Sequence, residues 1–77
     1  MTPKYMYHGM DITLDVYEKT RAVVEMIADM KKISFDDAFV LFASSKTYLA
    51  LSKPDSLMWS ESVEFIFDEF CLEQDAA

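Results

Sequence analysis

The sequence predicts an all-α protein: a small three-helix bundle with a short extra helical turn before the last helix and an extended N-terminal arm. Only one Gly and two Pro occur in the 77 residues, whereas an all-β chain of this length would need many tight turns. Hydrophobic residues make up 52% of the chain, enough to offset the entropy that is lost on folding. Within most segments these residues recur every three or four positions, which is the period of an α-helix.

The chain is expected to divide into an extended N-terminal arm, a single helical domain and a frayed acidic tail, over residues 1–12, 13–73 and 74–77. In the arm, Tyr5 and Tyr7 alternate with their neighbours without helical spacing, which is typical of an extended chain. Gly9 then permits a bend before the first helix. The last residues of a domain usually fray unless they are packed against it.

The first helix is expected near residues 14–32. Thr13 is its expected N-cap, and Asp15 in the first turn suits the positive end of the helix dipole. Lys31 and Lys32 suit the opposite end. The expected buried stripe has helical spacing and consists of Val16, Thr20, Val23, Ile27 and Met30.

The second helix is expected near residues 35–45 and has the clearest start signal of the chain. Ser34 stands three residues before Asp37, a variant of the capping box. Apolar residues surround nearly the whole helix, so we expect it at the centre of the bundle. Its main apolar face consists of Phe35, Ala38, Phe39, Phe42 and Ala43.

Two further segments complete the predicted bundle. A short helical piece over residues 47–51 must end before Pro54, because proline forces the preceding residue out of the α region. The last helix is expected near residues 60–73, with Ser60 as its N-cap and Ser56 as the alternative.

Six side chains are expected to be the most buried, and a seventh, Trp59, is expected to be mostly buried. The six are Phe39, Phe42, Val23, Ile27, Ile66 and Phe70. A buried Trp needs an acceptor for its indole N–H, because an unpaired buried donor costs about 1–3 kcal/mol. The alternative is that Trp59 is an exposed anchor for a partner, since Trp is enriched at binding hot spots.

The net charge of −7 comes entirely from the last third of the chain. Residues 1–53 hold seven basic and seven acidic residues, whereas residues 54–77 hold seven acidic residues and no Lys or Arg. Since no basic stripe is present to displace phosphate counterions, direct binding to nucleic acid is excluded. The acidic segment is either a solvated helix that keeps the protein in solution or a surface that steers a basic partner.

Catalytic, metal-binding and cofactor-binding patterns are not found in the sequence. His8 and Cys71 are the single His and the single Cys, too few for a zinc site, which needs about four such ligands. No general base stands at a recognisable spacing from a Ser or Thr hydroxyl. We therefore predict a protein that is not an enzyme and that binds no metal and no cofactor.

The sequence is typical of a cytoplasmic protein. Cys71 cannot form an internal disulfide, and a secreted domain of this size would normally need such bridges. The N-terminus lacks the apolar segment of a signal peptide. The most apolar uncharged run, Ala38 to Ser45, is far shorter than the roughly 20 residues of a membrane-spanning helix.

One side of the last helix is the candidate contact surface. Five residues with helical spacing form this ridge and its flank: Glu61, Phe65, Asp68, Glu69 and Leu72. The opposite ridge, which is expected to pack on the core, consists of Val63, Ile66, Phe67 and Phe70. We expect Phe65 and Leu72 to be partly exposed and to contact a protein with a basic or apolar surface. Alternatively, Tyr5 and Tyr7 of the arm cover Phe65, or its exposure has no function.

Two short segments form a moderately distinctive pattern, Phe42-Ala-Ser-Ser-Lys-Thr-Tyr-Leu-Ala-Leu51 and Leu57-Met-Trp-Ser-Glu-Ser62. In these segments and beyond, the chain resembles a family of short uncharacterised bacterial proteins, a domain of unknown function. The matching positions are Phe42, Ser45, Thr47, Tyr48, Leu51, Trp59, Ser62 and Asp68-Glu69-Phe70, within about residues 20–72. Members look like companions of small toxin-like genes, including ADP-ribosyltransferase-like ones. The resemblance implies an antitoxin or accessory role and carries over no catalytic residues.

The sequence supports two interpretations of function. In the first, the protein is a non-catalytic, acidic, helical interaction module, such as an antitoxin-like or inhibitory partner of a cytoplasmic protein. In the second, it is a homodimer with a structural or scaffolding role, in which the apolar stripe of the last helix packs against its own copy. Both interpretations are compatible with the lack of a catalytic residue pattern and with the exposed apolar residues that are expected on the last helix.

Overall fold

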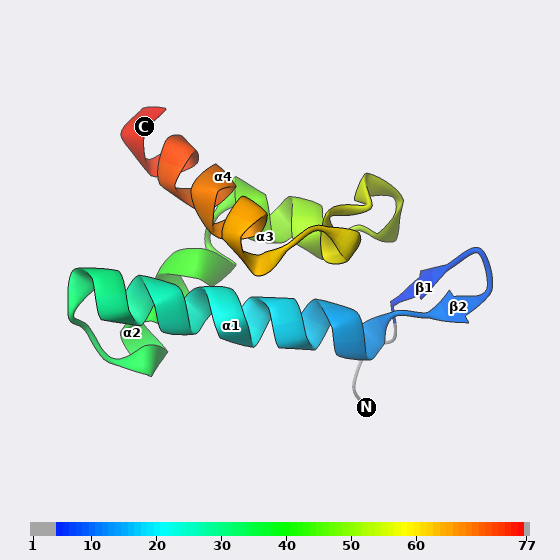
Figure 1. The fold of residues 1–77 in the computed structure, drawn as a ribbon, viewed down its shortest axis with the longest axis horizontal. Coiled ribbons are helices and arrows are strands. Elements are labelled where there is room, and N and C mark those ends of the chain that lie inside the picture. Colours follow the sequence, from blue (N-terminus) through cyan, green and yellow to red (C-terminus); the bar gives the residue numbers. More distant parts are fainter. Residues whose placement is uncertain (1–4, 77) are drawn as a thin grey trace.

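The computed structural model describes residues 5–76, which fold into a small helical bundle with one β-hairpin at its N-terminal end (Figure 1). In chain order, its elements are β1 (Met6–Tyr7), β2 (Met10–Asp11), α1 (Thr13–Lys31), α2 (Phe35–Ala43), α3 (Lys46–Leu51), the 3-10 turns η1 (Pro54–Ser56) and η2 (Met58–Ser60), and α4 (Val63–Ala76). The predicted all-α fold is confirmed, with α3 as the short helix before the last one.

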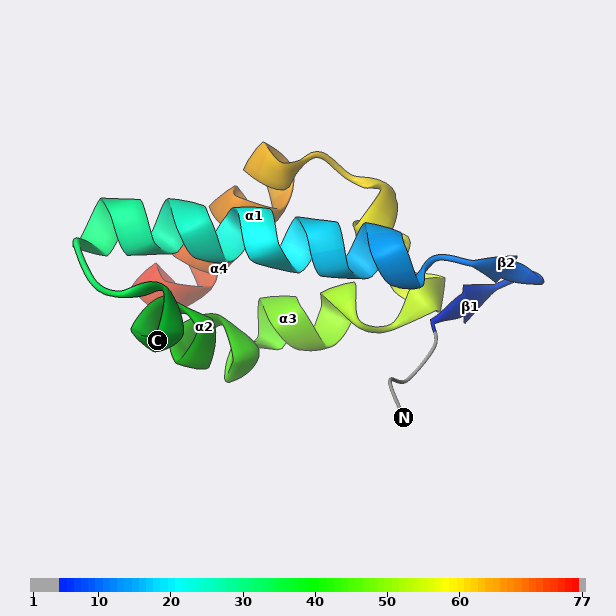
Figure 2. The same ribbon diagram turned by 90° about the horizontal axis from the view of Figure 1, so that it is seen from below.

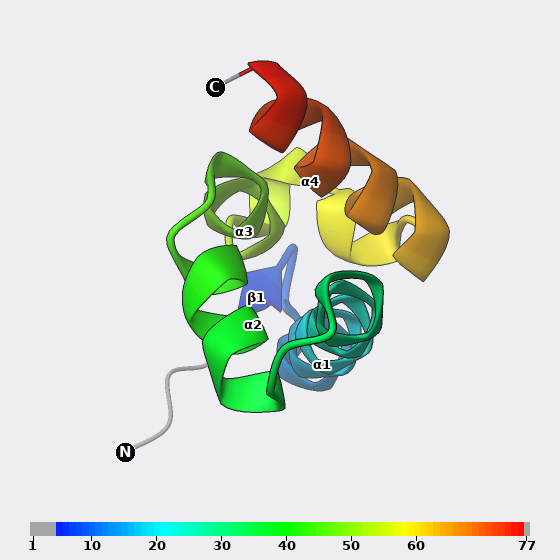
Figure 3. The ribbon, with the colours of Figure 1, turned by 90° about the vertical axis from the view of Figure 1, so that its left-hand side faces the viewer.

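The helices are arranged around α1, the longest of them. α2 and α3 follow one another along one side of α1, and α4 lies on another side (Figure 2, Figure 3). Their facing sides enclose the core, which consists of Ile12, Val16, Val23, Val24, Ile27, Ala38, Phe42, Leu51, Ile66 and Phe70. Phe42 packs edge-on against Phe70 and Tyr48, with ring centroids 5.8 and 5.4 Å apart. Five of the six predicted core residues are therefore confirmed.

The predicted extended arm is wrong for its described part, because β1 and β2 pair as an antiparallel hairpin. The two residues of its loop, His8 and Gly9, have φ angles of 48° and 84°. Positive φ at both positions is what a tight two-residue hairpin turn requires, and glycine adopts it without steric cost. The predicted bend at Gly9 is thus a complete chain reversal.

The hairpin projects from the N-terminal end of α1 and contacts the helices at its base, while Met6 and Met10 are about half exposed. Ile12, directly after β2, is only 2% exposed, and the Tyr7 ring lies 5.6 Å from the Trp59 ring. The hairpin therefore belongs to the same compact unit as the helices. Residues 1–4 of the predicted arm lie outside the described residues.

The start of α1 differs from the prediction that Thr13 would be its N-cap. The helix begins at Thr13 itself, after Ile12, without a side-chain cap. The Thr13 hydroxyl oxygen instead accepts a hydrogen bond from the Tyr5 N–H at 2.8 Å. Thr13 thereby ties the hairpin to α1, a contact that local sequence pattern does not reveal.

The predicted buried stripe of α1 is confirmed except at its C-terminal end. Val16, Val23 and Ile27 are fully buried, and the buried Thr20 hydroxyl donates to the Val16 carbonyl at 2.8 Å. Met30, by contrast, is 50% exposed. It lies in the last turn of α1, where α4 rises away from that helix (Figure 1).

Ser34 caps α2 as predicted, since its hydroxyl oxygen accepts a hydrogen bond from the Asp37 N–H at 3.1 Å. The backbone of Ser34 is extended, which is the usual conformation of an N-cap residue.

The predicted central position of α2 is wrong. Phe39, expected among the most buried residues, is 42% exposed, and so is Phe35. α2 has only nine residues and lies at the edge of the bundle, where a single side of it meets the core (Figure 3). The rest of its apolar surface, including Val40 and Leu41, is exposed.

The connection between α2 and α4 folds back over the bundle as predicted. α3 begins at Lys46, one residue earlier than expected, and Ser45 caps it by accepting from the Tyr48 N–H at 3.0 Å. Trp59 packs against the core with the larger part of its side chain covered, in agreement with the prediction. Its indole N–H has the expected acceptor, the Pro54 carbonyl at 2.9 Å.

α4 begins at Val63, three residues later than predicted. Its cap is Ser62, whose hydroxyl oxygen accepts from the Phe65 N–H at 3.1 Å. Ser60 and Ser56, the two predicted caps, lie in the 3-10 turns. At the other end, residues 74–76 of the predicted frayed tail continue the helix, and Ala77 lies outside the described residues.

Candidate functional site

Four of the five predicted contact residues lie together on the outward side of α4. Phe65 and Leu72 are 42% and 62% exposed. Asp68 is exposed as well, and Glu69 is half-buried. Ile66 and Phe70, on the opposite side of the helix, are fully buried, so α4 has one side in the core and one in solvent. We call the outward apolar pair, Phe65 and Leu72, the α4 ridge.

Glu61 does not belong to the α4 ridge, contrary to the sequence prediction. It precedes the helix in an extended conformation, and its carbonyl accepts a hydrogen bond from the Lys19 ammonium group of α1. Glu64 is the exposed carboxylate that takes its place. Its spacing to Asp68 and Asp75 puts the three acids along one edge of the ridge.

The hairpin does not cover the α4 ridge. Tyr5 packs edge-on against Tyr17 of α1, with ring centroids 6.0 Å apart, and Tyr7 packs against Trp59. The alternative in which these tyrosines shield Phe65 is therefore wrong, and Phe65 is a free surface residue of the isolated chain.

The electrostatics of α4 are one-sided. The helix contains five acidic residues and no basic residue. Glu73 and Asp75 stand near its C-terminus, where the negative end of the helix dipole disfavours carboxylates. For the exposed carboxylate of Asp75 this position is unfavourable in the isolated protein, and a nearby cationic group would relieve it.

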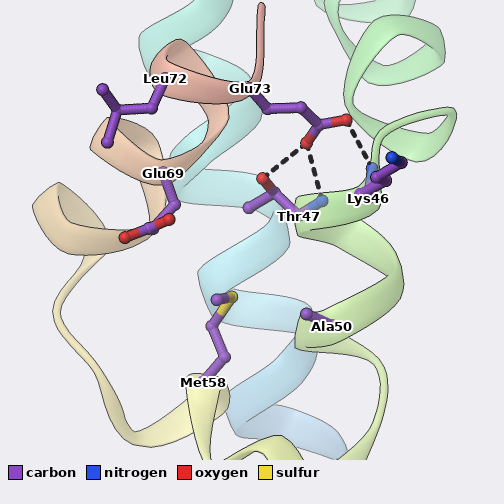
Figure 4. Close-up of a pocket in the computed structure, with 7 residues that line it drawn as sticks. All are labelled: Lys46, Thr47, Ala50, Met58, Glu69, Leu72 and Glu73. Atoms are coloured by element: carbon purple, nitrogen blue, oxygen red, sulfur yellow. Dashed lines mark hydrogen bonds between the residues drawn. The ribbon is translucent and has the colours of Figure 1, made fainter. Parts of the chain in front are cut away.

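Glu73, which the sequence analysis assigned only to the acidic excess, has a structural role. One of its carboxylate oxygens accepts from the Lys46 N–H at 2.8 Å (Figure 4). The other accepts from the Thr47 N–H at 2.9 Å and from the Thr47 hydroxyl at 2.8 Å. Glu73 thus joins the C-terminal half of α4 to the first turn of α3, a pairing of residues 26 and 27 positions apart.

The charge of Glu73 is stabilised by these contacts. Burial alone would raise the pKa of its carboxyl group, but the hydrogen bonds from Lys46 and Thr47 outweigh burial and hold the pKa below its usual value. The positive charge of Lys46 acts in the same direction. At neutral pH Glu73 is therefore ionised and fully engaged, which makes it unsuitable as a general acid or base.

Glu73 also borders a shallow pocket between α3 and α4, of about 370 Å³ (Figure 4). The pocket is lined by the apolar residues Ala50, Met58 and Leu72 and by the charged residues Lys46, Glu69 and Glu73. The pocket is open to solvent beside the α4 ridge and extends the apolar surface toward α3.

The remaining reactive group, Cys71, is half-buried in α4. Burial and then the negative charges of Asp68 and Asp75 raise the pKa of its thiol, and Lys31 opposes this only in part. The thiol is therefore protonated at neutral pH and is a poor nucleophile. In the part of the chain that the structure describes, no three His, Cys, Asp or Glu side chains come together as a metal site would require.

A second apolar surface, which the sequence analysis missed, lies between α1, α2 and α3. Six residues line a groove of about 280 Å³: Tyr17, Thr20, Arg21, Phe35, Phe39 and Tyr48. Tyr17 of α1 and the two phenylalanines of α2 are each 40–42% exposed. The signal for this aromatic groove was the nearly all-round apolar character of α2, which sequence reasoning attributed to burial.

No family model, no curated protein and no solved structure matches this chain. The resemblance drawn from the sequence therefore stays a prediction. Several residues of that pattern have structural roles here, since Ser45 and Ser62 cap α3 and α4 and Thr47 binds Glu73. Over residues 5–76, no helix combines the length and apolar character needed to cross a membrane.

Proposed function

We propose that the protein is a non-catalytic interaction module that binds a partner protein through the outward side of α4. The observation that carries this proposal is the α4 ridge: two exposed apolar side chains, Phe65 and Leu72, between edges of carboxylates. Protein interfaces commonly combine an apolar centre with a polar rim. The resemblance noted above supports an antitoxin-like or inhibitory role, in the cytoplasm, where a lone thiol stays reduced.

The expected partner has an apolar patch with basic residues around it. Opposite charges across an interface increase mainly the rate of association and the discrimination between partners. The carboxylate of Asp75 would gain most, because a cation beside it also offsets the negative end of the α4 dipole.

Self-association through the same ridge is the less favoured alternative. A two-fold symmetric contact places the same surface on both sides of the interface. It would bring two helices together that each carry five acidic and no basic residues. Like charges face to face oppose such a dimer, whereas a basic partner is attracted.

Affinity capture from the native host, with three matched baits, tests the proposal. The baits are the parent protein, Leu72→Ala on the ridge and Leu49→Ala on α3, whose side chains are 62% and 55% exposed. We expect the parent and Leu49→Ala to retain the same partner. Leu72→Ala should retain at least about fivefold less, since loss of an interface anchor costs about 1 kcal/mol or more.

When the capture is repeated at higher ionic strength, the partner should bind the bait more slowly. Salt screens the attraction between exposed charges on the two proteins. Circular dichroism of each bait checks that the fold is intact. If quantitative mass spectrometry finds one set of proteins on all three baits, with no loss on Leu72→Ala, the α4 ridge is not the binding surface.

A further inference from the structure

The pocket between α3 and α4 is continuous with the α4 ridge. Leu72, which is 62% exposed, belongs to both. Figure 4 shows Glu69 and Leu72 of α4 on one side of the pocket and Thr47 and Ala50 of α3 on the other. A partner that covers the ridge, as proposed above, would therefore also cover the mouth of this pocket.

Glu69 stands between the ridge and the contact that Glu73 makes with α3. At about 100° per residue, successive side chains around α4 follow the order Leu72, Phe65, Glu69 and Glu73. Glu69 is half-buried, and over residues 5–76 it takes part in no hydrogen bond or ion pair. A cation in contact with this carboxylate would replace the hydration that partial burial removes.

The other charges of the pocket lining leave Glu69 without compensation. Glu73 is held by three hydrogen bonds from α3. Lys46 is the single cation of the lining, and Figure 4 shows it on the α3 side of Glu73, away from Glu69. The lining therefore carries two negative charges and one positive charge, and the uncompensated negative charge lies beside the ridge.

The apolar part of the lining limits which cation fits. Ala50, Met58 and Leu72 offer a surface for methylene groups, and Glu69 offers a carboxylate beside them. A long cationic side chain can lay its apolar stem on such a surface while its charged head stays at the edge. Arginine fits better than lysine, since its planar guanidinium group can donate two parallel hydrogen bonds to one carboxylate.

We infer that this pocket receives an arginine side chain of the partner protein. The stem of the arginine packs on the apolar lining, and its guanidinium group pairs with the Glu69 carboxylate. The inference rests on the proposed function and adds one defined side chain of the partner to it. The carboxylates on the other edge of the ridge, Glu64, Asp68 and Asp75, are exposed and do not line this pocket. Their contribution is to the rate at which a basic partner associates.

A titration that needs no partner tests the inference on the purified chain. The probe is N-acetylargininamide, an arginine without charged ends, and its binding is followed in ¹H–¹⁵N correlation NMR spectra of the labelled protein. The amide signals of residues 46–50 and 69–73 should shift. N-acetylcitrullinamide has nearly the same shape without the charge and should bind at least about fivefold more weakly, because it lacks the ion pair.

Three variants distinguish the pocket from the general acidity of α4. Glu69→Gln keeps the shape of the side chain and should weaken arginine binding at least about fivefold. Ala50→Leu fills the pocket without changing a charge and should weaken binding as well. Glu64→Gln removes an exposed carboxylate from the other edge of the same helix and should leave binding unchanged. Circular dichroism checks that each variant is folded.

Three results would each overturn the inference: amide signals of α3 and α4 that do not shift, equal binding of the citrulline compound, or a Glu69→Gln variant that binds arginine like the parent. None of them bears on partner capture with Leu72→Ala, which tests the α4 ridge itself. If arginine binds as expected and capture does not depend on Leu72, the proposed function fails and the arginine pocket remains.

Discussion

Replacing Phe42 with Ala should remove about 3–5 kcal/mol of unfolding free energy, the range seen for large aromatic residues deleted from cores. Phe42 is fully buried, and its ring packs edge-on against Phe70 of α4 and Tyr48 of α3. One side chain thus joins three helices. A chain of this size has a total stability of only about 4–12 kcal/mol, so the variant should be largely unfolded or close to it.

Phe39→Ala is the matched control, because it removes the same side chain from the same helix. Phe39 is 42% exposed at the edge of the aromatic groove, so its truncation should cost far less, about 1 kcal/mol. Urea unfolding followed by circular dichroism, in dilute protein to exclude self-association, measures both. Equal losses for the two variants would contradict the observed placement of α2.

Replacing Glu73 with Ala should cost about 2 kcal/mol, because hydrogen bonds to a charged group contribute about 1.5–3 kcal/mol and a lost helix cap about 0.5–2 kcal/mol. The carboxylate accepts from two backbone N–H groups and one hydroxyl at the start of α3. Its removal leaves these donors to water and separates α3 from α4. Urea unfolding of Glu73→Ala and the parent measures the loss.

The cost of losing Glu73 should depend on pH with a defined sign. Because the contacts lower the pKa of Glu73 in the folded protein, ionised Glu73 stabilises the fold above the ordinary value of 4.5. That contribution is lost as the pH falls through the lowered folded-state pKa. The difference in unfolding free energy between the parent and Glu73→Gln should therefore be full at neutral pH and shrink in acid.

Asp75→Ala is the control for Glu73, since it removes an exposed carboxylate from the same helix. Asp75 stands at the negative end of the α4 dipole, so this variant should have unchanged or slightly higher stability. If Glu73→Ala and Asp75→Ala behave alike at neutral pH, the hydrogen bonds of Glu73 do not hold α3 and α4 together.

The elements that sequence predicted well are those with local signals. The helical spacing of α1 placed Val16, Val23 and Ile27 in the core, and Ser34 marked the start of α2. The errors arose where a residue is used by a distant element. Thr13 binds the Tyr5 backbone instead of capping α1, and neither helical spacing nor a capping pattern encodes that contact.

The surface was harder to predict than the core. The sequence of α4 has two apolar ridges, and a helix in a small bundle can bury only one of them. The exposure of Phe65 and Leu72 was predicted on this ground, and both are exposed in the structure. The aromatic groove did not follow, because an all-round apolar helix is compatible with central burial as well as with an open face. Only the position of α2 at the edge of the bundle, with Phe35 and Phe39 exposed, distinguishes the two.

Core and proposed contact surface lie on opposite sides of α4, so two residues that are adjacent in sequence, Phe65 and Ile66, belong to different surfaces. Unfolding free energy and partner capture should be measured together on Phe65→Ala and Ile66→Ala, whose side chains are 42% and 0% exposed. We predict that Phe65→Ala keeps its stability within about 1 kcal/mol and loses at least about fivefold in capture. Ile66→Ala should instead lose about 2–5 kcal/mol of stability. A Phe65→Ala protein that is destabilised by several kcal/mol and still captures the partner normally would show that Phe65 belongs to the core and that the partner binds elsewhere.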